Sequence, residues 1–172
     1  MRRAAKPTPA GLIALEALRI ESGAPRPGVD FPSADDAAAG EPVYSPAALG
    51  LPHLAPVNRA WFNGRRALAA GGARAERDVC VVDLDAEETS PGASIYAGGV
   101  AVGTITSCAW SPRRRRMLAF VTLPPGARAR TLEADGVARD APRVAARIAA
   151  TAESGLADAF LAVQEKATES PH

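Results

Sequence analysis

The sequence predicts an α+β fold, in which an N-terminal helix and loop region is followed by an antiparallel Greek-key β-barrel of about six strands. Two observations support this prediction. Short apolar runs alternate with turn residues over residues 77–135, as they do in all-β units. Residues 11–22 (GLIALEALRIES) instead have the apolar spacing of an amphipathic helix.

Residues 92–112 (GASIYAGGVAVGTITSCAWSP) predict two strands joined by a tight turn. The Gly-Gly dipeptide at 98–99 suits a two-residue hairpin, because both positions can take a positive φ. Strand alternation places Gly103, Ile105 and Ser107 on one face of the returning strand. Gly103 has no side chain, so another backbone or a bend can lie close to it.

Three further runs predict strands: residues 77–85 (RDVCVVDLD), 117–123 (MLAFVTL) and 130–135 (RTLEAD). The run at 117–123 is apolar except for Thr122, which is typical of a buried strand. Residues 142–151 are either the last barrel strand or a helix, because their alanine-rich periodicity favours neither. Residues 155–166 (GLADAFLAVQEK) predict an amphipathic helix.

The predicted helix at 11–22 has signals at both ends. Thr8 can cap it, Pro9 suits its first turn, and Gly23 suits its end. Its wide apolar face comprises Leu12, Leu15, Leu18 and Ile20. A helix this short and apolar is not stable alone in water, so we expect it to pack on a partner surface.

The composition is that of an ordinary soluble globular protein and excludes several classes of partner. Of the 172 residues, 47% are hydrophobic and 23% are charged, and the net charge is +1. So balanced a charge predicts no nucleic-acid partner and no membrane partner. No apolar run reaches the roughly 18 residues of a membrane span, and no signal peptide is recognisable. We therefore expect a cytoplasmic protein.

Few residues suggest chemistry. Cys80 and Cys108 lie far apart in the sequence, which predicts buried thiols in a reducing compartment. The chain has only two histidines, and we predict no metal ligands. The acidic residues within 83–88 and the four arginines at 113–116 predict solvated loops. The Trp-Phe pair at 61–62 predicts core packing.

Four stretches together resemble the aminomethyltransferase family, which comprises the glycine-cleavage T-protein and its tetrahydrofolate-dependent demethylase relatives. They are LRIESG with PRPGVD at 18–30, FNGRRAL at 62–68, the hairpin at 92–112 and the strand at 117–123. Each stretch is moderately specific, but they occur in the family's order and span most of the chain. The resemblance implies the end of a folate-binding domain followed by the family's C-terminal barrel.

The resemblance also implies tetrahydrofolate as the cofactor and Arg19 as a cofactor-binding residue. In that family the arginine of the L-R-[IL]-E-x-G motif lines the folate pocket, and Arg19 is the matching position. The alternative for Arg19 is a solvated cation near the C-terminal dipole of its helix. Two positions depart from the family pattern, since Pro27 replaces a frequent aromatic residue and Cys108 a usual glycine. The branch in tRNA-linked iron–sulfur repair is disfavoured, because Trp61 stands where its cysteine would be.

By this resemblance, residues 1–70 are a remnant of the folate-binding domain, residues 71–151 are the barrel, and residues 152–172 are a helical tail. The catalytic aspartate of the family lies in a part that would precede residue 11. We therefore assign no catalytic residue and expect the chain to be inactive alone.

Three functions remain open from the sequence. The chain could be a truncated or split aminomethyltransferase that works with a separate N-terminal half or as a homo-oligomer. It could be a non-enzymatic folate-binding or protein-interaction module, or a small structural partner unrelated to folate. The helix at 11–22 distinguishes the first two. An uncovered apolar face supports a split enzyme, whereas packing on the chain's own barrel supports a module.

Overall fold

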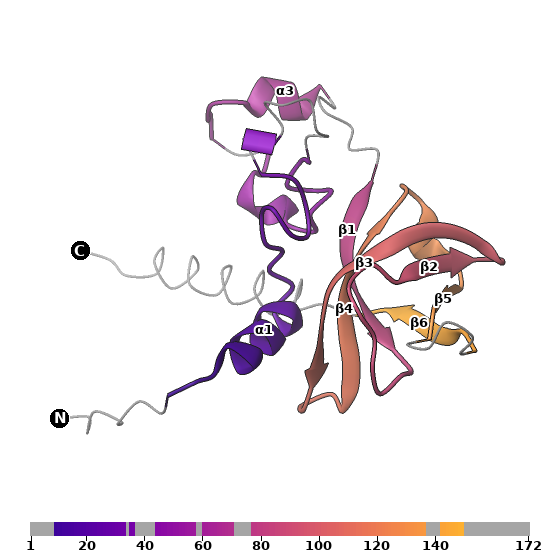
Figure 1. Cartoon of the computed structure of the whole chain (residues 1–172). Helices are drawn as coiled ribbons and strands as arrows, with labels where there is room; N and C mark the ends of the chain where they lie inside the picture. The colour runs from indigo at the N-terminus through magenta and orange to yellow at the C-terminus, as the bar shows by residue number, and fades with distance from the viewer. Residues whose placement is uncertain are drawn as a thin grey trace, which may run out of the picture.

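The computed structural model describes residues 9–33, 35–36, 44–57, 60–70, 77–136 and 142–149. Its main body is a closed β-barrel, with short helices outside it (Figure 1). The strands are β1 (Asp78–Leu84), β2 (Ser94–Ala97), β3 (Val100–Ser111), β4 (Arg116–Leu123), β5 (Leu132–Ala134) and β6 (Val144–Ile148). The helices are α1 (Leu12–Glu21), η1 (Pro52–Leu54), α3 (Arg65–Ala69) and η2 (Ala127–Ala129). The tail helix predicted at 155–166 lies outside the described residues.

Neighbouring strands of the barrel are antiparallel and follow the order β1-β4-β3-β2-β5-β6, with β6 pairing back to β1. The consecutive strands β2, β3 and β4 lie side by side, and β1 lies beside β4, which is a Greek-key order. The predicted fold class is therefore confirmed. The structure also decides between the alternatives at 142–151, because Val144–Ile148 pair with both β1 and β5.

Strands β1 and β4 bury side chains on both faces, which explains the unbroken apolar runs at 79–82 and 117–121. Alternate residues of each strand belong to two different clusters. The cluster inside the barrel contains Cys80, Val82, Leu84, Ile95, Ile105, Met117, Val121, Leu123 and Leu132, among others. The cluster on the outer face contains Ile20, Val79, Val81, Leu118, Phe120 and Ala149. The outer cluster is where the N-terminal region rests on the barrel.

The predicted hairpin is confirmed. Gly98 and Gly99 form its turn with φ values of 63° and 83°, a region that favours glycine. Gly103 lies deeper in β3, against β4. A Cβ atom at Gly103 would overlap with the Thr122 carbonyl oxygen and would lie 2.8 Å from Leu123 Cδ2. The expected close approach of another backbone is thus present, and it is the backbone of β4.

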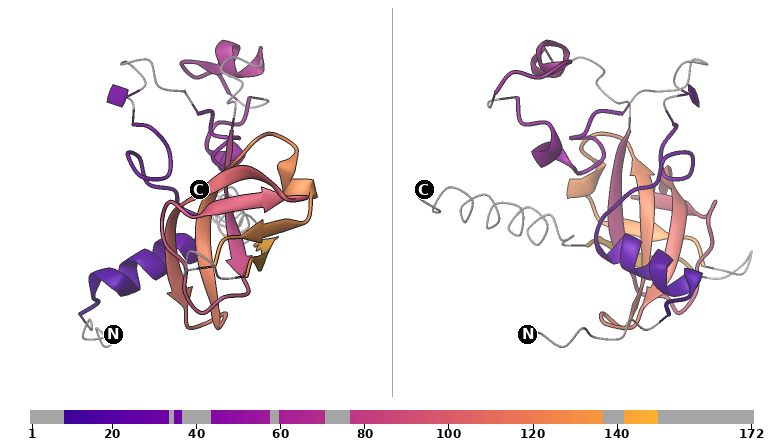
Figure 2. Two further views of the ribbon diagram at one scale, coloured as in Figure 1. Left: turned by 45° about the vertical axis from the view of Figure 1, so that its right-hand side comes forward. Right: turned by 90° about the vertical axis from the view of Figure 1, so that its left-hand side faces the viewer.

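Helix α1 lies against the outer face of the barrel, over β3 and β4 (Figure 2). It begins at Leu12 after Gly11, which provides no side-chain cap, so the cap predicted at Thr8 is wrong. The prediction that the apolar face of this helix packs on a partner surface is also wrong in part. Ile20 is fully buried, but Leu15 and Leu18 remain 50% and 62% exposed. The helix turns polar residues toward the barrel instead.

The prediction of core packing at 61–62 is wrong for Trp61, which is 78% exposed, whereas Phe62 is half-buried. The segment with η1 and α3 lies beyond one end of the barrel (Figure 1). Arg65 holds this segment together locally, because its Nε donates to the Val57 carbonyl oxygen at 2.7 Å. Within the described ranges, no helix has the length and apolarity needed to cross a bilayer.

Candidate functional site

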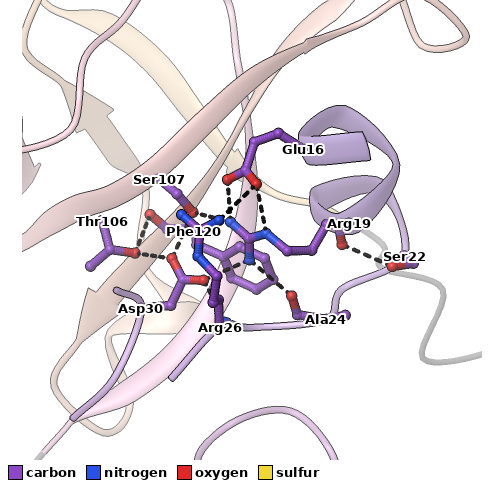
Figure 3. A network of polar contacts seen from close by, with 9 residues as sticks. All are labelled: Glu16, Arg19, Ser22, Ala24, Arg26, Asp30, Thr106, Ser107 and Phe120. Carbon is purple, nitrogen blue, oxygen red and sulfur yellow. Dashed lines mark hydrogen bonds and ion pairs between the residues drawn. The ribbon is translucent and has the colours of Figure 1, made fainter. Parts of the chain in front are cut away.

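A cluster of polar side chains fills the corner between α1, the loop that follows it and strand β3 (Figure 3). Its centre is an ion pair between Arg19 on α1 and Asp30 on the loop, with Nη1 and Oδ2 2.6 Å apart. The side chain of Asp30 is 0% exposed, and that of Arg19 is 16% exposed. The solvated cation considered for Arg19 is therefore wrong, because Arg19 ties α1 to the barrel.

Asp30 accepts hydrogen bonds at both of its carboxylate oxygens. A backbone turn positions Asp30. In this turn the Gly28 N–H donates to the Phe31 carbonyl oxygen, and the Asp30 N–H donates to the Arg26 carbonyl oxygen. The described residues give its carboxylate four hydrogen bonds, two to each oxygen. Oδ2 accepts from Arg19 Nη1 at 2.6 Å and from the Arg26 backbone N–H at 2.8 Å. Four bonds fill the acceptor capacity of a carboxylate, which is why the group can be fully buried.

The other two donors to Asp30 come from a β-bulge in β3. In the pairing with β4, Ile105 faces Val121 and Ser107 faces Phe120, so Thr106 is an extra residue. The bulge breaks the alternation, and both hydroxyls reach Asp30 Oδ1, at 2.7 Å from Thr106 and 2.6 Å from Ser107. The predicted face shared by Ile105 and Ser107 is therefore wrong, because Ile105 lies inside the barrel while Ser107 faces α1.

Arg19 uses all five of its N–H groups within the chain. Nη1 donates to Asp30 and to the Ala24 carbonyl oxygen at 2.9 Å. Nη2 donates to Ser107 Oγ at 2.8 Å and to Glu16 Oε1 at 2.5 Å, and Nε donates to Glu16 Oε2 at 3.1 Å. The guanidinium also lies over the Phe120 ring, 5.2 Å from its centroid. Glu16 thus occupies the planar fork that arginine offers to a carboxylate.

The charges in this corner stabilise one another. The hydrogen bond from Arg19 lowers the pKa of Glu16 below its ordinary value, although partial burial opposes this effect. Burial works against the charged form of Arg19, but its bonds to Glu16 and Asp30 outweigh that, and the pKa of Arg19 is raised. A carboxyl group with a lowered pKa stabilises the fold above its unfolded-state pKa. This contribution is lost as the pH falls through the lower, folded-state pKa of Glu16.

A second contact fixes the end of α1 to the barrel. Ser111 Oγ at the end of β3 donates a short hydrogen bond to Glu21 Oε1. Arg113 approaches the other oxygen of Glu21, with Nε 3.4 Å from Oε2. Polar contacts of Arg19 and Glu21 therefore hold the last turn of α1 against β3.

The charged runs predicted as solvated loops are partly ordered by ion pairs. Arg114 and Asp83 are 3.4 Å apart and each is 24% exposed, so the solvated description is wrong for this pair. Arg116 and Asp85 are 3.5 Å apart and more exposed, as predicted. The acidic neighbours of the arginine turn offset its positive charge, which is unfavourable for binding a phosphate.

Two hollows adjoin the polar corner. A cavity of about 60 Å³ lies between the end of α1 and the barrel, lined by Ser22, His53 and Val79 among others. It is too small for a folate, since ligand sites typically measure about 300–1,000 Å³. A more open hollow of about 350 Å³ lies beside Asp30 and is lined by the rings of Phe31 and Tyr44. These rings have centroids 6.3 Å apart, and they offer an aromatic wall next to the corner.

Cys108 on β3 is half-buried and donates weakly to the Thr89 carbonyl oxygen at 3.4 Å. Burial raises its pKa above the ordinary value, and the charge of Glu16 adds to the effect. The thiol therefore stays protonated at neutral pH, and we expect Cys108 to react with iodoacetamide more slowly than a free peptide cysteine. Mass spectrometry of time points at pH 7.5 measures this rate. A faster rate than the peptide's would contradict the burial of the thiol.

The sequence singled out Arg19 but did not identify its partners. Glu16 was recognisable, because a carboxylate and an arginine three residues apart in a helix are neighbours. The involvement of Thr106 and Ser107 was not, because it depends on a bulge that moves adjacent side chains to one side. In the described part of the chain, no three His, Cys, Asp or Glu side chains are grouped so as to hold a metal ion.

The comparisons with known proteins agree with this architecture. Residues 77–152 match the family model of the glycine cleavage T-protein C-terminal barrel domain. The structure is similar to that of the glycine cleavage system aminomethyltransferase T from Bartonella henselae, with a TM-score of 0.58 and 18% sequence identity. The match covers 78% of this chain and 36% of the other, so the chain spans about a third of that protein's length. No curated protein sequence matches the chain. Residues 77–152 are thus similar to the C-terminal barrel domain of the glycine cleavage T-protein.

Proposed function

We propose that this chain is the barrel-bearing part of a tetrahydrofolate-dependent aminomethyltransferase of the glycine-cleavage type, and that it acts in the cytoplasm. The observation that carries the proposal is the family match over the barrel. The similarity to a solved glycine cleavage aminomethyltransferase supports the same fold. The polar corner at Arg19, a residue of α1 that the resemblance also singles out, supplies a place where a folate could contact the chain.

We further propose that residues 1–172 do not catalyse the transfer alone. Acid–base chemistry on a folate adduct needs a carboxylate that can approach the reacting atoms. The acidic groups of the corner are already engaged, Glu16 and Asp30 by Arg19 and Glu21 by Ser111. A separate N-terminal half, or a second copy in a homo-oligomer, would supply the remaining groups.

Arg19 and the fork that Glu16 occupies define the folate contact that we propose. A folate carries carboxylates on its glutamyl part, and the Nε and Nη2 atoms of Arg19 would bind one of them in the same planar way. Glu16 is 26% exposed and can rotate away, whereas Asp30 is buried and stays in place. Glu16 therefore competes with the ligand for Arg19, and the affinity of the wild-type chain should be weak.

Calorimetric titration with tetrahydrofolate tests this proposal. We expect Glu16→Ala to bind about tenfold more tightly than the wild type, because a charged hydrogen-bond partner of Arg19 is removed from competition. Arg19→Lys should bind more weakly than the wild type, since lysine lacks the planar fork. Glu133→Ala is the control, because Glu133 lies on β5, pairs with Arg143 at 3.7 Å and should leave the affinity unchanged when replaced.

Equal affinity of the wild type and Glu16→Ala would contradict the proposed contact. Transfer of a one-carbon unit by the isolated chain would contradict the claim that it is inactive alone. The two results are independent, so the contact and the incompleteness of the enzyme are tested separately.

A protein-interaction module is the second candidate function. The packing of α1 on the chain's own barrel favours it, whereas the exposed leucines of α1 favour the split enzyme. The absence of any calorimetric response to tetrahydrofolate in the wild type and in Glu16→Ala would favour this candidate over the first.

A further inference from the structure

The turn between β3 and β4 carries an arginine that the polar corner does not use. This turn lies at the end of the barrel away from η1 and α3 (Figure 1). The other three arginines of the run pair with carboxylates: Arg113 with Glu21, Arg114 with Asp83, and Arg116 with Asp85. Arg115 is exposed, and no hydrogen bond or ion pair joins its side chain to another described residue.

The backbone of Arg115 has a conformation that an arginine rarely adopts. Its φ is 54°, and among the described residues it is the one residue other than glycine with a positive φ. Glycine and asparagine are the usual residues in this region, because a Cβ atom with a long side chain raises the conformational energy. A cation kept at such a position, without a partner in the described structure, is a candidate for contact with a ligand.

A hollow of about 280 Å³ lies beside Arg115 at this end of the barrel, and Trp110 is part of its lining. Trp110 comes two residues after Cys108, which packs against the cluster inside the barrel. Strand alternation therefore directs both side chains to the same side of β3. The strand ends one residue later, and Trp110 is 43% exposed. The mouth of a β-barrel is a common place for a small-molecule site.

We propose that this hollow binds a free α-amino acid with an apolar side chain. Its lining offers a partner for each part of such a ligand. The Arg115 guanidinium can bind the carboxylate through a planar pair of N–H donors. The exposed carboxylates of Asp85 and Glu87 can accept hydrogen bonds from the ammonium group. Trp110 and Ala86 supply an apolar surface for the side chain.

The balance of charges favours a ligand that carries both signs. Two guanidinium groups and two carboxylates line the hollow, from Arg115, Arg116, Asp85 and Glu87. The carboxylates would repel a phosphate, and the guanidinium groups would repel an amine that has no carboxylate. An amino acid has an oppositely charged partner for each of its groups. None of these residues belongs to the polar corner, so the inference does not depend on the proposed folate contact.

Nuclear magnetic resonance titration of the ¹⁵N-labelled full chain with L-leucine tests the proposal. The chain has two tryptophans and therefore two indole N–H signals, which a Trp61→Phe variant assigns. The Trp110 signal should shift with a dissociation constant of about 1 mM or weaker, because an open hollow leaves much of the ligand in water. The Trp61 signal should not shift, since Trp61 does not line the hollow.

Two analogues of L-leucine test the two charges separately. Leucinamide lacks the carboxylate, and N-acetyl-leucine lacks the ammonium group. Each should bind at least about tenfold more weakly than L-leucine, because one charged hydrogen-bonding contact is lost.

The variant Arg115→Gly separates binding from stability. It removes the guanidinium group, but glycine suits the positive φ at this position. The affinity for L-leucine should therefore fall at least about tenfold, while the urea midpoint should not fall. Arg113→Gln is the matched control, because it removes the same charge from the same turn but not from the hollow. It should leave the affinity within about twofold of the wild type.

An unchanged Trp110 signal in the presence of L-leucine would overturn the proposal. Equal binding of N-acetyl-leucine would also overturn it and assign the hollow to carboxylates in general. Equal binding of leucinamide would overturn it in favour of amines. An affinity of Arg115→Gly equal to that of the wild type would overturn it as well, because the carboxylate would then have no partner at Arg115.

Discussion

Replacing Asp30 by alanine should lower the free energy of unfolding by about 3–5 kcal/mol, the usual cost of removing one partner of a buried ion pair. The carboxylate accepts four hydrogen bonds, so its loss leaves Arg19 Nη1 and the hydroxyls of Thr106 and Ser107 without their acceptor. The guanidinium keeps Glu16 as a partner, which limits the loss. Urea denaturation followed by circular dichroism measures the change.

Asp85→Ala is the control for this prediction, because Asp85 also pairs with an arginine but its side chain is 73% exposed. It should cost less than about 1 kcal/mol. The double variant Arg19→Ala/Asp30→Ala should cost less than the sum of the two single variants, since the two groups interact directly. Additive costs, or an Asp30→Ala protein as stable as the wild type, would show that the corner does not hold α1 on the barrel.

Replacing Gly103 by alanine should destabilise the barrel by about 3 kcal/mol, at the upper end of the range for overpacking. The added Cβ would overlap with the backbone oxygen of Thr122, which cannot move without disturbing the pairing of β3 with β4. Gly103→Val should cost at least as much, because it adds further methyl groups at the same place. The midpoint of urea unfolding, with the slope m as a check on two-state behaviour, measures both variants.

Gly11→Ala is the matched control for Gly103→Ala. A Cβ at Gly11 has no neighbour within 4 Å, and its φ of −76° suits any residue. The only expected cost of Gly11→Ala is that alanine is a poorer helix N-cap than glycine. This should lower the free energy of unfolding by less than about 1 kcal/mol. Equal unfolding midpoints for Gly103→Ala and the wild type would mean that β3 and β4 are farther apart than the structure has them.

The strands could be located from the sequence because each was marked by local chemistry. Buried strands were visible as largely apolar runs, as in Met117–Leu123 of β4. The hairpin turn was marked by two glycines that tolerate positive φ. The exception was residues 142–151, whose small side chains satisfy either a helix or a strand. Pairing of β6 with β1 and β5 decided it, since a sheet offers the backbone hydrogen bonds that the local sequence does not specify.

The candidate site was predictable only at Arg19. From its position near the end of a helix, Arg19 would be a solvated cation. In the structure its guanidinium instead donates hydrogen bonds to Glu16, Asp30 and Ser107. Asp30 and Ser107 are 77 positions apart, and no local pattern relates them. Their contact requires both the barrel and the extra residue in β3.

The sequence by itself determined the barrel and its hairpin, because these follow from side-chain periodicity and turn residues. Only the tertiary structure decided which face of α1 meets the barrel. Periodicity identifies an apolar face but not its partner, and here the buried ion pair with Asp30 and the anchor of Glu21 on Ser111 turn the polar face inward. The hydrogen-bonding needs of a few buried groups fixed the orientation of the helix, and the leucines were left at the surface.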